Sequence, residues 1–83
     1  MPGEFNYSTM TILKNEGAEH HKEAATWFEL AAKHHIEAAK YHEEGNYEEA
    51  AHHAIAARGN QLKGEQASDR AAEYHSKDHG NKR

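Results

Sequence analysis

The chain has 83 residues, a formal net charge of −4 and no cysteine, so it holds one domain at most, without disulfides, thiolate metal sites or cysteine nucleophiles. Its ten Lys and Arg residues form no basic face and are outnumbered by fourteen Asp and Glu residues, which argues against a nucleic-acid partner. No stretch approaches the ~20 consecutive apolar residues of a membrane span, so we expect no membrane partner.

Residues 1–14 are predicted to be a leader or a flexible N-terminal segment. The first residues show no helical period and contain the only proline. Either residues 1–9 are native, or they precede a natural start at Met10. Because the segment lacks the basic and apolar regions of a signal peptide, and because cysteine is absent, we expect a cytoplasmic protein.

A helical hairpin is predicted over residues 15–79, and its first helix over about residues 16–44. Asn15 followed by Glu16 is a typical helix start, and the Ala, Glu and Lys residues that follow favour a helix. Projected at ~100° per residue, the segment has one charged face and one broad apolar face. The apolar face consists of Ala24, Ala25, Trp27, Phe28, Ala31, Ala32, Ile36, Ala38 and Ala39.

The clearest local signal is a turn at residues 45–46. Gly45 suits the left-handed conformation that follows a helix end. Asn46 is a good first cap for a new helix, with Glu49 in the place of the capping-box carboxylate. Since so short a turn joins only antiparallel neighbours, it predicts an αα-hairpin.

The second helix is predicted over about residues 47–78, followed by a flexible tail at residues 80–83. Its inward positions keep a 3-4 spacing across Gly59 and Gly64, which favours one continuous helix. The alternative is a third helix that begins near Gln61. Residues that face each other about the turn should have numbers adding to roughly 91, which places Gly64 opposite Trp27 with Phe28 beside it.

Two resemblances support the hairpin. Residues 38–50, continuing to Ala54 and Ala57, resemble a single tetratricopeptide helix-turn-helix, with its small residue, aromatic residues, glycine turn and spaced alanines. One repeat implies nothing about peptide binding. Residues 31–42 and 50–54, with their His-His pairs, resemble small bacterial Ala/His-rich hairpin proteins of uncharacterised function. This likeness implies a helical hairpin and no particular activity.

Nine histidines are the unusual feature of the composition. The projection places His35 and His42 at the middle of the apolar face of the first helix, and His75 and His79 as an i, i+4 pair on the second. One interpretation makes these four the ligands of Zn, Cu or Ni. The other makes imidazole a polar filler between the helices, with no cofactor. The sequence Glu49-Ala50-Ala51-His52 is discounted as a metal site because it lies off the inner stripe.

The sequence contains no phosphate-binding loop and no nucleophile with a matching base, so we expect no enzyme and no catalytic residues. The leading hypothesis is an all-α structural or interaction protein whose long antiparallel hairpin pairs as a homodimeric four-helix bundle, and whose histidines make it responsive to pH. A different protein partner and a histidine-rich metal-binding or buffering protein are the alternatives. The predicted core and interface consist of Trp27, Phe28, Ile36, Tyr41, Tyr47, Ala54, Ile55 and Gly64.

Overall fold

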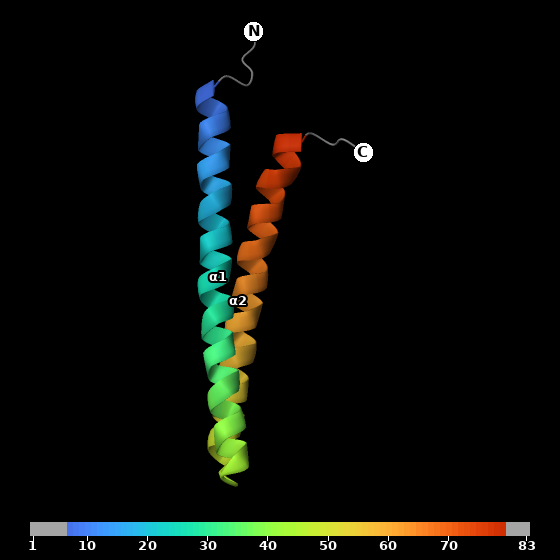
Figure 1. Ribbon diagram of the computed structural model, residues 1–83. Coiled ribbons are helices and arrows are strands. Elements are labelled where there is room, and N and C mark those ends of the chain that lie inside the picture. Colours follow the sequence, from blue (N-terminus) through green and yellow to red (C-terminus); the bar gives the residue numbers. More distant parts are fainter. Residues whose placement is uncertain (1–6, 80–83) are drawn as a thin grey trace.

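The computed structural model describes the backbone of residues 7–79 and the side chains of residues 14–73. Within this part of the chain it consists of two helices, α1 (Tyr7–Glu43) and α2 (Tyr47–His79), and contains no strand. The helices run antiparallel and pack against each other, so the start of α1 and the end of α2 lie at the same end of the molecule (Figure 1). The predicted all-α helical hairpin is confirmed, and it measures 66 × 23 × 13 Å.

The first helix begins at Tyr7, well before the predicted start at residue 16. The segment between Tyr7 and Asn15 contains neither proline nor glycine, and several of its residues are good helix formers. No residue between Tyr7 and Asn15 therefore stops the helix. Asn15 lies inside α1 and does not cap its start. Residues 1–6 and the predicted tail at 80–83 lie outside the described residues.

The turn is held by hydrogen bonds at both helix ends. Gly45 has a φ of +81°, and its N–H donates to the carbonyl of His42 at 3.0 Å. The N–H of Asn46 donates to the carbonyl of Tyr41 at 2.8 Å, which completes a Schellman ending of α1. The Asn46 side-chain oxygen then accepts from the N–H of Glu49 at 3.3 Å and caps α2. The reciprocal half of a capping box cannot form, because the Asn46 N–H is already used.

The second helix is continuous through both of its glycines, so the alternative of a third helix near Gln61 is wrong. Its end at His79 agrees with the predicted 78 within the usual uncertainty of helix ends. Gly59 is exposed, whereas Gly64 is buried against α1.

The helices meet along an inner seam whose positions alternate three and four residues apart, the spacing of a two-stranded coiled coil. All of these positions are buried or half-buried. The seam consists of Gly17, His20, Ala24, Trp27, Ala31, His34, Ala38 and Tyr41 on α1, and of Ala50, His53, Ala57, Asn60, Gly64, Ala67 and Ala71 on α2. Among the side chains of residues 14–73, those that are fully buried are all alanine methyl groups.

The side chain nearest to Gly64 is Phe28, which was predicted to lie beside the contact, and not Trp27, which was predicted to face the glycine. A β-carbon built at Gly64 would lie 2.6 to 2.9 Å from three ring carbons of Phe28, closer than real side chains approach. The Trp27 ring instead meets Lys63, whose Nζ lies 5.1 Å from the ring centroid. The facing rule was right to within one residue, but it did not give the rotation of α1 about its axis.

Most of the predicted core and interface residues are exposed in the single hairpin. Gly64 is buried, and Trp27 and Tyr41 are half-buried. Ile36 is 66% exposed and Ile55 is 71% exposed, so neither belongs to the contact between α1 and α2. The others, Phe28, Tyr47 and Ala54, are exposed as well.

The two glycines of α2 give a matched test of this packing. Gly59→Ala adds a methyl group in open space, so it should stabilise the protein by about 1 kcal/mol through helix propensity. Gly64→Ala gains the same propensity but has to push the Phe28 ring away, so it should be less favourable than Gly59→Ala by about 1–2 kcal/mol. Thermal or urea unfolding of both variants measures the difference. Equal gains at both sites would mean that Phe28 does not pack on Gly64.

Candidate functional site

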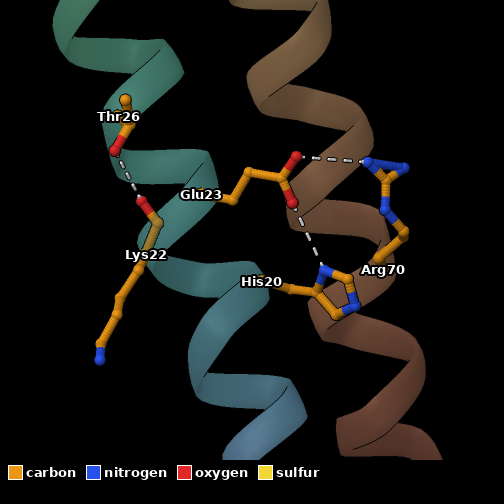
Figure 2. A network of polar contacts seen from close by, with 5 residues as sticks. All are labelled: His20, Lys22, Glu23, Thr26 and Arg70. Carbon is orange, nitrogen blue, oxygen red and sulfur yellow. Dashed lines mark hydrogen bonds and ion pairs between the residues drawn. The ribbon is translucent and has the colours of Figure 1, made fainter.

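One edge of the inner seam carries a polar network that joins the helices (Figure 2). Glu23 on α1 lies between two partners: its Oε2 is 3.7 Å from Nη2 of Arg70 on α2, and its Oε1 is 3.5 Å from Nδ1 of His20. Thr26 donates a hydrogen bond to the backbone carbonyl of Lys22 at 3.1 Å. Glu23 and Arg70 are nearly half exposed, and ion pairs in such positions contribute about 0–1 kcal/mol. The network adds one weak polar contact between the two helices at this edge of the seam.

Closer to the turn, a pair of histidines bridges the two helices on the inner seam. The Nδ1 atoms of His34 and His53 lie 3.0 Å apart, so one ring donates a hydrogen bond to the other. Their ring centroids are 5.2 Å apart, and both residues are half-buried. The ring of Tyr41 stacks on the ring of His53, with centroids 5.5 Å apart and planes only 9° from parallel. Histidines are thus part of the contact between the helices, but they are not the ones that the projection selected.

The structure describes the side chains of two of the four predicted metal ligands, His35 and His42. His35 and His42 are exposed, and the ring of His42 lies against Tyr47 with centroids 5.0 Å apart. His75 and His79 belong to α2, but their side chains lie outside the described residues. Among the side chains of residues 14–73, no group of three or more His, Asp or Glu residues converges on a point that would hold a metal ion.

The sequence did contain a signal for the histidines that meet. His34 follows Ala31 by three residues and precedes Ala38 by four, and His53 stands in the same way between Ala50 and Ala57. A 3-4 count from the alanines would therefore have placed both rings on the inner seam. The Glu49-x-x-His52 sequence forms only an exposed i, i+3 contact, with Glu49 Oε2 3.8 Å from His52 Nδ1.

A second row of residues on α1 repeats the composition of the inner seam. We call it the outer seam, and it is the inner seam of α1 displaced by one residue along the chain. It consists of Ala18, His21, Ala25, Phe28, Ala32, His35, Ala39 and His42. Every one of these residues is exposed, and none is Lys, Arg, Asp or Glu. The repetition arises because the sequence of α1 contains pairs of identical adjacent residues, such as Ala24-Ala25, His34-His35 and Ala38-Ala39.

Contacts with α2 fix the side of the hairpin on which the outer seam lies. His42 meets Tyr47, and Phe28 covers the backbone of Gly64. Two further contacts with α2, the ion pair of Glu23 with Arg70 and the contact of Trp27 with Lys63, are made by residues of α1 that do not belong to the outer seam. The hairpin therefore has an outer seam of alanine and rings that α2 only partly covers.

Comparisons with known proteins give no match to a family model, a curated protein or a solved structure. Within the described residues, neither helix is long and apolar enough to cross a membrane. The resemblances to tetratricopeptide and Ala/His-rich hairpins stay predictions, and the function has to be inferred from the surfaces of the hairpin itself.

Proposed function

We propose that this protein is a small structural or interaction protein that self-associates through the outer seam. Two hairpins pair outer seam to outer seam and form an antiparallel, homodimeric four-helix bundle. The observation that supports this proposal is the repetition of the inner seam in the outer one. A row of small residues and rings that already packs against one antiparallel helix is suited to pack against another of the same kind.

The thin core of the single hairpin also favours association. Between residues 14 and 73 nothing larger than an alanine side chain is fully buried, and each methyl-sized group contributes only about 0.8 kcal/mol. Small folds with so little buried apolar surface usually need a disulfide, a metal or a partner. Disulfides are excluded by composition. A second copy that covers Phe28, still 40% exposed, supplies the missing burial.

The distribution of charge favours a second copy as the partner. The solvated face of a helix normally carries Lys and Glu, as α1 does at Lys22, Glu29 and Lys33. The outer seam has no such charges, so two identical seams meet around a two-fold axis without like-charge repulsion. We propose no catalytic role, and the absence of cysteine suits the reducing cytoplasm.

A charge placed in the outer seam should separate the two copies. Light scattering should give about twice the chain mass of 9.4 kDa for the parent protein, and the chain mass for Ala32→Glu. The added carboxylate would face its own copy near the centre of the seam, a juxtaposition that costs several kcal/mol, roughly a hundredfold or more in affinity.

Thr26→Glu is the matched control, because it adds the same charge to α1 at an exposed position away from the outer seam. This variant should stay dimeric. A parent protein that is a monomer with a cooperative melt would refute the dimer, and equal behaviour of the two variants would place the contact elsewhere.

Acid should weaken the dimer, because the outer seam contains three histidines, His21, His35 and His42. Imidazole side chains in general gain a proton near pH 6.5, and covering them without an anionic partner disfavours the charged form. The separated hairpins then bind more protons than the dimer, so dissociation increases as the pH falls. Sedimentation or light scattering between pH 8 and 5 at constant salt should show a shift from dimer to monomer below about pH 6.5.

Fixed charges stand next to two of these histidines in the sequence. Lys22 follows His21 and Glu43 follows His42, whereas the charged residues closest in sequence to His35 are Lys33 and Glu37. Replacement of the three histidines by Gln keeps the seam polar but removes the titration, so the variant should remain dimeric at pH 5. A parent that is equally dimeric at both pH values would contradict the pH response. So would dissociation that persists in the Gln variant.

A further inference from the structure

The inner seam holds a second binding feature that does not depend on the proposed dimer. We propose that His34 and His53 form a two-imidazole site for a divalent cation of the late first transition row, Cu²⁺ in the first place and Ni²⁺ or Zn²⁺ with lower affinity. The two rings come from different helices, and both present the same ring nitrogen to each other at 3.0 Å. Neutral imidazole is the nitrogen ligand that these cations prefer, and their affinities follow the order Zn²⁺ and Ni²⁺ below Cu²⁺.

The separation of the two nitrogens matches what one cation requires. Metal–imidazole bonds are about 2.0–2.1 Å long, and two of them at an angle of ~95° hold their nitrogens about 3.0 Å apart. The observed Nδ1–Nδ1 distance is 3.0 Å, and the ring centroids, 5.2 Å apart, show that the two nitrogens point almost straight at each other. Each ring therefore has to turn by roughly 40° before both lone pairs point at a cation that lies beside the line between the nitrogens. The angle lies between those of square-planar and tetrahedral coordination, which suits Cu²⁺ and Zn²⁺ respectively.

The surroundings hold the two ligands in place and leave the site open to water. Both histidines lie on continuous helices, and stacking against Tyr41 restrains the His53 ring. Both are half-buried, so the remaining coordination positions fall to solvent. Glu37 and Glu49, also half-buried, stand one helical turn from His34 and from His53 respectively, and the Glu49 carboxylate contacts His52.

Binding of the cation moves one proton within the histidine pair and changes the number of protons on the two rings by none. In the neutral pair, one ring carries its proton on Nδ1 and donates it to the Nδ1 of the other ring. When the cation binds, that proton moves through solvent to the Nε2 of the same ring, which carried none. Both Nδ1 lone pairs then face the cation. Protonation of either imidazole removes a ligand, so binding should weaken in acid.

Each histidine of the pair has a neighbour in sequence that serves as its control. His35 follows His34, His52 precedes His53, and both neighbours are exposed. The experiment is a calorimetric titration of the protein with CuCl₂, and then with ZnCl₂ and NiCl₂, for the parent and for four variants. These variants are His34→Gln, His53→Gln, His35→Gln and His52→Gln. Gln keeps a polar side chain at each position, and circular dichroism checks that each variant is helical.

The strongest 1:1 event should be lost in His34→Gln and in His53→Gln, and kept in the two control variants. Because the cation joins α1 to α2, it should also raise the melting temperature of the parent by about 5 °C or more at a free concentration tenfold above Kd. That rise should vanish in the two seam variants only. An equal effect of all four variants, or an unchanged melting temperature, would show chelation by surface histidines and overturn the proposal.

Discussion

The two helices are held together along a row of buried alanines and the buried Gly64, and the rest of the structure depends on this close approach. Ala24 and Ala31 on α1 face a row on α2 that includes Ala57 and Gly64, and no side chain larger than a methyl group is fully buried between residues 14 and 73. Larger side chains at these positions would separate the axes, as the contact of Phe28 with Gly64 shows. The rings of the inner seam, such as Trp27 and Tyr41, are therefore only half-buried.

This arrangement explains why the surface of the hairpin has the character of an interface. The sequence of α1 contains pairs of similar adjacent residues, so each small residue or ring of the inner seam is followed in the sequence by a similar residue of the outer seam. One row is used by α2 and the other is left exposed and without fixed charge. The histidine doublets divide in the same way, since His34 pairs with His53 inside the seam while His35 lies outside it. The dimer and the cation site that we propose would thus use the same repeated pattern that packs the hairpin.

The helical hairpin could be predicted from the sequence, but the positions of the histidines in it could not. The turn at residues 45–46 was predictable because a left-handed glycine and an Asn cap are local signals with few alternatives. The roles of the histidines were not, because a projection at ~100° per residue drifts by ~20° per heptad from the 3.5-residue period of a coiled coil. That drift merged the inner and outer seams into one broad face, with His35 and His42 at its centre. It hid the pairing of His34 with His53, which depends on the rotation of each helix about its axis.

The central claim, that a second copy covers the outer seam, is tested most directly by isotope-filtered NOE measurements on a mixture of labelled and unlabelled chains. The account predicts intermolecular contacts from the methyl groups of Ala25, Ala32 and Ala39, and from the ring of Phe28. The methyl groups of Ile55 and Leu62, exposed on α2, serve as an internal comparison and should show none. Intermolecular contacts confined to Ile55 and Leu62, or their absence in a folded sample at millimolar concentration, would contradict it.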